Sequence, residues 1–248
     1  LAEDQRIATP RKLLRESIDY KNSVPEYADK KLYAGICINS GSLTDSGYKT
    51  DLLNFYTVHD CDGYMVYADG IDKDTNQVTL FHYIDTLLKL QHYTKRPVIA
   101  GRLLNGLGLG LISWGLAGYS SGAARFENFS EELHKDASAG YNLYERYYFP
   151  ELLGTVSIEK KLPTRLNQIS QVLGSCQCQY CKGKSAQDVI IAQNNKLHFL
   201  HSIHSEVEKV KGTDDKKSYF LRRIDEAIAN YNKLKHVFKK DDYKHLLV

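Results

Sequence analysis

The first part of the chain alternates short apolar runs with longer amphipathic segments, a rhythm that predicts strands followed by helices. Each apolar run is partly β-branched and ends in small or polar residues, as strands of a covered parallel sheet do. The expected strands and helices are, in chain order, helix 10–20, strand 32–38, helix 48–58, strand 63–68, helix 80–93, strand 97–103, helix 107–116 and strand 118–121.

This alternation repeats about every 30 residues, which suits right-handed βαβ crossovers. Four such units would form half of a (β/α)8 barrel or a small doubly wound sheet. We therefore predict an α/β fold that contains all or part of a (β/α)8 TIM barrel. In both architectures, functional side chains come from the carboxyl ends of the strands.

Polar residues and glycines follow the expected strands and form the candidate binding edge. Because parallel strands end at the same edge of a sheet, we expect Asn39, Asp69, Arg102 and Ser120 to converge on one pocket. Plainer roles remain open, namely a helix cap or solvated charge for Asp69 and an ion pair for Arg102. The full candidate set comprises Asn39, Ser40, Gly41, Asp69, Gly70, Arg102, Ser120 and Ser121.

The pattern changes after residue 125, where a polar, tyrosine-containing stretch leads to a cysteine cluster and two amphipathic helices. Those helices are expected at residues 187–211 and 216–238. We therefore divide the chain into a barrel portion, residues 1–158, and a zinc-binding helical C-terminal subdomain, residues 159–248.

Composition narrows the class of protein only a little. The 248 residues carry a formal net charge of +3, which permits a polyanionic partner without demanding one. The most apolar stretch, residues 103–124, is interrupted by glycines, and the opening residues are charged, so we expect neither a membrane span nor a secretory signal. An odd, clustered set of five cysteines argues against a disulfide framework, and we expect a cytoplasmic protein.

Three cysteines stand within six residues and predict a metal site. Cys176, Cys178 and Cys181 can turn their sulfurs toward one tetrahedral ion, for which a histidine of the next helix would complete a structural zinc site. His198 and His201 share a helix face, and we favour His198 as the fourth ligand. Unconnected buried cysteines and a redox cluster are the alternative interpretations.

These motifs resemble those of the tRNA-guanine transglycosylases and their DNA-modifying, DpdA-type relatives. That family places C-x-C-x-x-C late in a (β/α)8 barrel, before a helix with a segment like H-N-L-H-F-L. Here residues 195–200 read Asn-Lys-Leu-His-Phe-Leu, so the family's zinc histidine falls on Asn195 and the ligand moves to His198. Residues 38–41 stand where the family has V-Q-G-G, so Asn39 would supply the purine-binding amide. Residues 61–64 stand where it has Y-D-G-Y, upstream of Asp69 and Gly70.

The resemblance implies base exchange in nucleic acid. A carboxylate attacks the ribose C1′, guanine leaves and a 7-deazaguanine base enters. The strand that carries the family's nucleophilic aspartate corresponds to residues 119–122, which read Tyr-Ser-Ser-Gly. Asp69 is the one acid that we place at a strand end, so it is the candidate catalytic residue.

The expected function is therefore a guanine transglycosylase-like activity on DNA or tRNA, with the departures from the tRNA-enzyme pattern favouring DNA. The expected partners are nucleic acid and a 7-deazaguanine base, and a protein partner or a second copy of the chain is left open. One alternative is a non-catalytic, zinc-containing nucleic-acid-binding or assembly subunit that keeps the barrel. A further alternative is an unrelated TIM-barrel hydrolase with a structural zinc.

Overall fold

The computed structural model describes residues 5–57, 61–72, 75–103, 105–121, 144–159, 161 and 163–238. These residues form two compact units. The sheet unit comprises the described residues up to Leu103 together with Gly115–Ser120. The hairpin unit comprises residues 105–114, Ser121 and the described residues from 144 onward.

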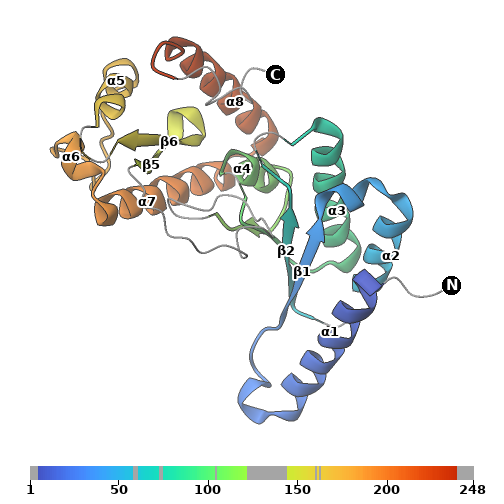
Figure 1. Cartoon of the computed structure of the whole chain (residues 1–248). Coiled ribbons are helices and arrows are strands. Elements are labelled where there is room, and N and C mark those ends of the chain that lie inside the picture. Colours follow the sequence, from blue (N-terminus) through green and yellow to red (C-terminus); the bar gives the residue numbers. More distant parts are fainter. Residues whose placement is uncertain are drawn as a thin grey trace. The chain divides into compact units, whose positions relative to one another are not determined.

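The sheet unit is a parallel α/β layer, as the sequence pattern predicts (Figure 1). Its four described strands are hydrogen-bonded in the order β1-β2-β3-β4, and every pair is parallel. A complete (β/α)8 barrel would need twice as many strands. The elements of this unit are α1 (Gln5–Ser23), η1 (Pro25–Tyr27), β1 (Tyr33–Asn39), η2 (Ser40–Thr44), α2 (Ser46–Thr57), β2 (Gly63–Asp69), α3 (Gln77–Thr94), β3 (Val98–Gly101) and β4 (Gly118–Tyr119).

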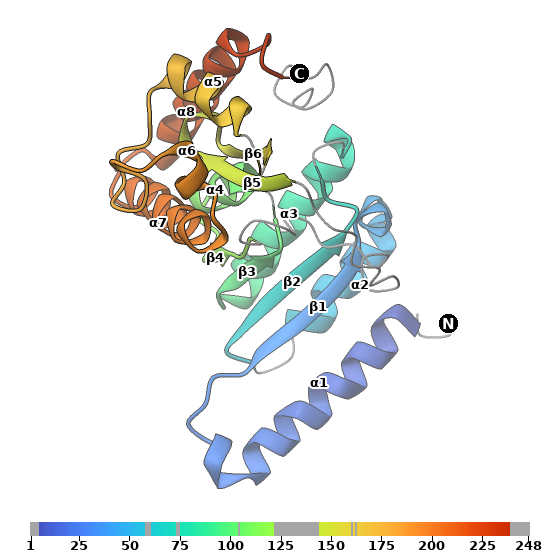
Figure 2. The same ribbon diagram turned by 60° about the vertical axis from the view of Figure 1, so that its left-hand side comes forward.

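Burial alternates along β1, so the two faces of this strand differ. Ala34, Ile36 and Ile38 are buried, whereas the residues between them are exposed. Helices α2 and α3 lie on one side of β1 and β2 in both views (Figure 2). We had expected strands covered on both faces, but β1 has one open face, where its alternate positions Tyr33, Gly35, Cys37 and Asn39 are exposed.

The hairpin unit combines two antiparallel strands with five helices among its described residues. Its elements are α4 (Asn105–Ser113), β5 (Tyr144–Phe149), η4 (Pro150–Leu152), β6 (Gly154–Glu159), α5 (Thr164–Leu173), α6 (Ala186–Val189), α7 (Ala192–Lys211) and α8 (Lys216–Lys233). The expected helix at 107–116 is α4. The expected helix at 187–211 is divided into α6 and α7.

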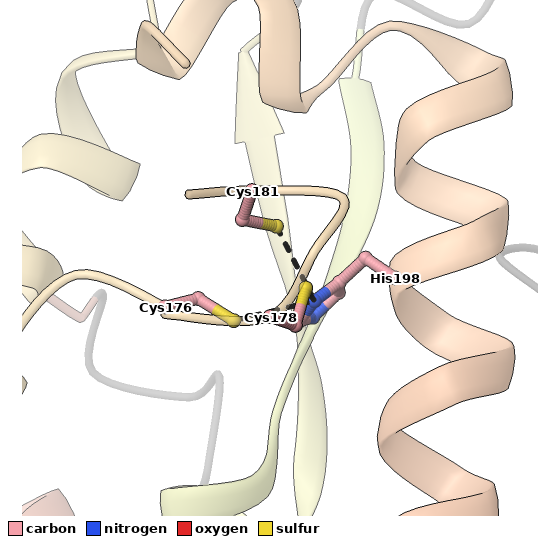
Figure 3. A group of neighbouring side chains, drawn as sticks. All are labelled: Cys176, Cys178, Cys181 and His198. Carbon is pink, nitrogen blue, oxygen red and sulfur yellow. Dashed lines mark hydrogen bonds between the residues drawn. The ribbon is translucent and has the colours of Figure 1, made fainter. Parts of the chain in front are cut away.

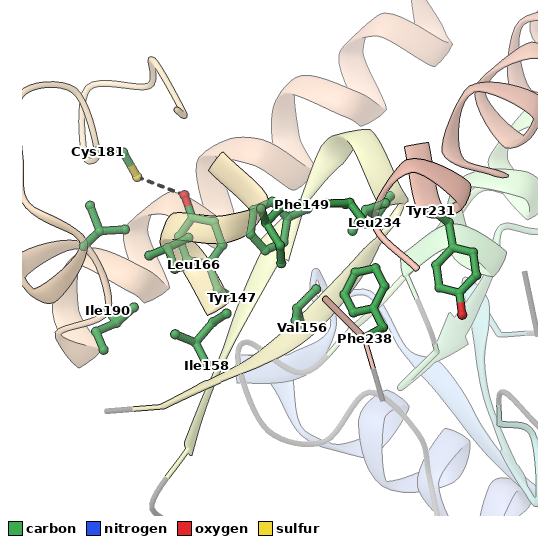
Figure 4. Close-up of a cluster of buried hydrophobic side chains, with 13 residues drawn as sticks. Tyr147, Phe149, Val156, Ile158, Leu166, Cys181, Ile190, Tyr231, Leu234 and Phe238 are labelled. Atoms are coloured by element: carbon green, nitrogen blue, oxygen red, sulfur yellow. Dashed lines mark hydrogen bonds between the residues drawn. The ribbon is translucent and has the colours of Figure 1, made fainter. Parts of the chain in front are cut away.

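The core of the hairpin unit forms where the β5–β6 pair meets α5, α6 and the end of α8 (Figure 4). Tyr147 and Phe149 of β5 and Val156 and Ile158 of β6 are at most 5% exposed. Cys181 belongs to the same apolar cluster, so the cysteine loop is part of this core. We had placed the subdomain boundary between residues 158 and 159, but β6 spans it. Both strands of the hairpin belong to the same unit as the cysteine loop and pack in the same core.

Among the described residues, no helix combines the length and the apolar character needed to cross a membrane.

Candidate metal centre

The three cysteines lie on a tight loop between α5 and α6. Backbone hydrogen bonds from the amides of Cys181 and Lys182 to the carbonyl of Cys178, at 3.0 and 2.9 Å, close the turn. Gly183 continues it with φ of 74°, a conformation that glycine adopts without steric cost. Local sequence therefore brings Cys178 and Cys181 together, and Cys176 approaches from the preceding residues.

His198 completes the group from the middle of α7, and its side chain is fully buried. Figure 3 shows the imidazole pointing from the helix toward the cysteine loop. Its Nδ1 atom lies 3.4 Å from Sγ of Cys181, 3.5 Å from Sγ of Cys178 and 3.6 Å from Sγ of Cys176. All four ligand atoms lie within 4.8 Å of one another.

These separations match one tetrahedral metal ion. With Zn–S of ~2.3 Å and Zn–N of ~2.0–2.1 Å, a tetrahedral site would separate nitrogen and sulfur by about 3.6 Å. The three nitrogen–sulfur distances, 3.4 to 3.6 Å, lie close to that value. Cys176, Cys178, Cys181 and His198 could therefore hold a metal ion, which favours the metal-site interpretation over unconnected cysteines.

A hydrogen bond to the neighbouring strand orients the imidazole of His198. Its Nε2 atom lies 2.8 Å from the carbonyl oxygen of Tyr148. Because a carbonyl oxygen can only accept, Nε2 carries the proton and donates it. The neutral imidazole then has its lone pair on Nδ1, which faces the three sulfurs. β5 thus selects the tautomer that a metal ligand needs.

Tyr147, the preceding residue of β5, covers the other side of the group. Its ring stacks on the His198 imidazole, and its hydroxyl lies 3.3 Å from Sγ of Cys181. Burial, together with the hydrogen bond to Cys181, raises the pKa of Tyr147 far above its ordinary value. The phenol therefore keeps its proton and could donate it to the Cys181 thiolate that metal binding would require.

The thiols are coupled to one another. The hydrogen bond from Cys181 lowers the pKa of Cys176 against the opposing effect of burial, and His198 adds to the lowering. The same hydrogen bond, with burial, raises the pKa of Cys181. A proton is thus shared within the Cys176–Cys181 pair. A divalent cation would displace it, because cysteine binds metals as the thiolate.

The structure favours His198 over the other residues considered as the fourth metal ligand. His201 is exposed, and its ring lies 5.9 Å from that of Tyr180 in an edge-on arrangement. Asn195, also considered above, is buried and donates through its side-chain amide to the carbonyl of Arg146 at 2.9 Å. Asn195 therefore holds α7 against β5, leaving His198 one turn later to face the cysteines.

Sequence reasoning missed the two tyrosines of β5 as parts of this centre. Tyr147 and Tyr148 both lie in the tyrosine-containing stretch after residue 125, to which we assigned no role from the sequence. Ser202 was also missed; its hydroxyl lies 3.5 Å from Nδ1 of His198, one helical turn away.

The candidate residues of the sheet unit come together in two groups at the carboxyl ends of the strands. In the β1–β2 register, Asn39 pairs with Asp69. A Cβ atom at Gly70 would stand 3.1 Å from Oγ of Ser40. The side-chain oxygen of Asn39 also accepts from the amide of Gly41 at 2.9 Å. Asn39, Ser40, Gly41, Asp69 and Gly70 therefore occupy one short stretch of the sheet edge.

Arg102 and Ser120 form the second group, at the ends of β3 and β4. The hydroxyl of Ser120 accepts from the backbone amide of Arg102 at 3.0 Å. Arg102 has φ of 51°, unusual for a residue with a side chain. Ser121 is grouped with the hairpin unit rather than with the sheet. Convergence of both groups on one pocket stays a prediction.

Comparisons with protein families and with curated proteins identified no relative of this chain.

Proposed function

We propose that Cys176, Cys178, Cys181 and Nδ1 of His198 bind one structural zinc ion. Three thiolates and one imidazole are a ligand set typical of closed structural zinc sites, which leave no position for a substrate. The ligands join the loop after α5 to α7, and Tyr148 links the same histidine to β5. The ion would therefore stabilise the packing of loop, helix and hairpin.

We propose further that the sheet unit is part of a (β/α)8 barrel. The described strands follow chain order without the reversal that marks a doubly wound sheet. The open face of β1 is also in keeping with a barrel, because helices cover the outside of a barrel while the inner face meets other strands. Strand order and this one-sided cover support the barrel over the doubly wound alternative.

For the activity, we propose guanine exchange in nucleic acid. The observation that carries it is the pairing of Asn39 with Asp69 at the carboxyl ends of β1 and β2, the edge where barrel enzymes place their sites. The Asp69 carboxylate would form a bond to the ribose C1′ as the bond from C1′ to guanine breaks. A 7-deazaguanine base would then attack C1′ and release the carboxylate. The amide of Asn39 would hydrogen-bond the purine.

One observation favours the non-catalytic alternative. Residues 119–122, where the resembled family has its nucleophilic aspartate, hold two serines instead. The hydroxyl of Ser120 already accepts a hydrogen bond from the Arg102 amide, so it serves to join the ends of β3 and β4. If Asp69 does not replace the missing nucleophile, the chain would bind nucleic acid without exchanging bases.

The deciding experiment measures incorporation of labelled guanine into DNA and into tRNA, alongside a gel-shift assay. Asp69→Asn should abolish exchange and any covalent adduct that survives denaturation, while Asp51→Asn, an exposed change on α2, should leave both intact. Binding without exchange by the unaltered protein would rule out the enzyme and support the binding subunit. Slow residual exchange in Asp69→Asn would make Asp69 a binding residue rather than the nucleophile.

A further inference from the structure

A groove in the sheet unit lies apart from the strand ends, between α1 and the segment that leads into β1. It has a volume of about 570 Å³, within the ~300–1,000 Å³ range of ligand pockets. Leu13, Tyr20 and Lys21 line it from α1, and Tyr27, Lys30 and Lys31 line it from the segment that follows. Figure 2 shows α1 and the short turn through which the chain returns to β1.

Two tyrosine rings stand in this groove with much of their surface in solvent. Tyr20 is 60% exposed and Tyr27 is 38% exposed. Their ring centroids are 5.9 Å apart and their planes are tilted by 40°, so the two rings are neighbours without being parallel. Exposed, side-by-side aromatic rings are the feature on which proteins stack the bases of single-stranded nucleic acids.

Backbone hydrogen bonds fix the turn that carries the two tyrosines. The amide of Val24 donates to the carbonyl of Tyr20 at 3.2 Å, and the amide of Tyr27 donates to the carbonyl of Val24 at 2.9 Å. Pro25 begins η1 between them and restricts the turn further. The groove is therefore preformed, so a ligand would bind without having to order this turn.

The charges around the tyrosines are mainly positive. The groove is lined by Lys21, Lys30 and Lys31 and by one acidic residue, Glu16. Glu16 lies 3.8 Å from the ammonium group of Lys12, and this pair is weak because both side chains are largely exposed. Lys30 has Asp29 at 3.6 Å, but both of these side chains are largely exposed and the pair is weak. Phosphates could replace such a partner.

From this combination we infer that the groove binds a single-stranded segment of nucleic acid. One base stacks on Tyr20 and another on Tyr27, and the neighbouring phosphates lie against Lys21, Lys30 and Lys31. The inference rests on the proposed function for the identity of the polymer, and it adds a contact surface that the strand-end residues do not provide. A flanking single strand held here would anchor the substrate by its backbone and bases without reading its sequence.

The test uses fluorescence anisotropy with labelled single-stranded DNA and RNA oligonucleotides of about 12 nucleotides and the full-length protein. Tyr20→Ala and Tyr27→Ala should each weaken binding about 5- to 100-fold, the range expected for loss of one base–aromatic stack. Tyr20→Phe keeps the ring and should keep the affinity. Tyr93→Ala removes a similarly exposed tyrosine from α3 and should change nothing.

Salt dependence tests the lysines independently of the rings. Each lost phosphate contact should reduce the slope of log affinity against log salt by about 0.7 for a single strand. Lys30→Gln with Lys31→Gln should therefore flatten the slope, whereas Lys211→Gln, an exposed change in the hairpin unit, should not. An unchanged slope would overturn the assignment, as would equal losses in Tyr20→Ala and Tyr93→Ala or equally tight binding of double-stranded DNA.

The exchange assay separates this inference from the proposed function. Groove variants that lose oligonucleotide affinity while the protein exchanges no base would support the groove and refute the enzyme. Groove variants with full affinity in a protein that does exchange bases would refute the groove alone. Thermal unfolding of each variant checks that the fold is retained, which the high exposure of Tyr20 leads us to expect.

Discussion

The phenol ring of Tyr147 lies flat on the imidazole of His198, with ring centroids 4.3 Å apart and planes within 7°. From that position its hydroxyl reaches Sγ of Cys181. One residue of β5 thus packs on the candidate histidine ligand and hydrogen-bonds a candidate cysteine ligand, while the next residue, Tyr148, accepts from the same imidazole. The hairpin is therefore a structural support for the metal centre.

Tyr147→Phe should weaken metal binding while leaving the fold in place. The change keeps the ring that stacks on His198 but removes the hydroxyl that donates to Cys181. Loss of such a supporting hydrogen bond typically lowers metal affinity by about 10–100-fold. Competition with a chromophoric chelator measures the affinity. Tyr83→Phe, which removes a buried hydroxyl from the sheet unit, is the control, and an equal effect there would contradict the role of Tyr147.

Cys178→Ser should remove the metal and unfold the hairpin unit. The purified protein should contain one zinc per chain, and binding free energies of about 10–16 kcal/mol are typical of structural zinc in small peptides. Trp114, the single tryptophan, lies in this unit with its ring 6.3 Å from that of Phe220, so its fluorescence reports unfolding there. A strong chelator should produce the same change in the unaltered protein.

The matched control is Cys37→Ser, which replaces an exposed cysteine of the sheet unit. It should leave zinc content and tryptophan emission unchanged. Purified protein that contains no zinc, or that keeps its tryptophan signal after the metal has been removed, would contradict a structural metal.

The sequence predicted the four residues of the candidate metal centre because most of that group is local. Three cysteines within six residues already restrict the geometry, and only the histidine had to be chosen. The choice between His198 and His201 needed tertiary information, because both lie on one helix face and β5 decides which is buried. Asn195 illustrates the same point, since its amide is committed to the carbonyl of Arg146.

The strands β1 and β2 were also predicted closely, since each is a short apolar run that ends in a turn. The β5–β6 pair was missed because its segment, YERYYF, is rich in polar atoms, and the apolar partners that bury it are distant in sequence. The open face of β1 was missed for a related reason. Glycine, cysteine and tyrosine are apolar enough to suggest burial, but whether they are covered depends on what packs there.

Glu206→Ala should destabilise the hairpin unit strongly. The Glu206 side chain is only 3% exposed, and Arg223 of α8 meets it at 3.1 Å while also donating to the carbonyl of Pro150 at 2.7 Å. Removing the carboxylate leaves the largely buried guanidinium with Glu226, at 2.8 Å, as its remaining acidic partner, so the cost should reach at most about 3 kcal/mol, the lower end for breaking a buried pair. Urea unfolding followed by Trp114 fluorescence measures the change.

Glu208→Ala provides the comparison for Glu206 on the same helix. Its side chain is 56% exposed and lies 3.5 Å from Lys211, so the change should cost no more than about 1 kcal/mol. Equal losses in the two variants would show that the Glu206–Arg223 pair contributes nothing beyond a surface ion pair.

Asp85 of α3 joins α3 to α2 and should make the stability of the sheet unit depend on pH. Its carboxylate lies 3.2 Å from the ammonium group of Lys49 and 2.9 Å from that of Lys89. Burial opposes ionisation, but the hydrogen bonds from Lys89 and Lys49 outweigh it and hold the pKa of Asp85 below its ordinary 3.8. The folded protein therefore binds this proton less tightly than the unfolded chain. The resulting stabilisation is complete above the unfolded pKa and is lost as the pH falls through the lower, folded pKa.

Asp85→Asn should cost up to about 1 kcal/mol at pH 7, since these side chains are partly exposed. The difference from the unaltered protein should shrink below pH ~4. Urea titrations followed by far-UV circular dichroism at both pH values measure it, with Asp51→Asn as the exposed control. A cost that stays constant across this range would show that the carboxylate's charge is not what stabilises the contact between α2 and α3.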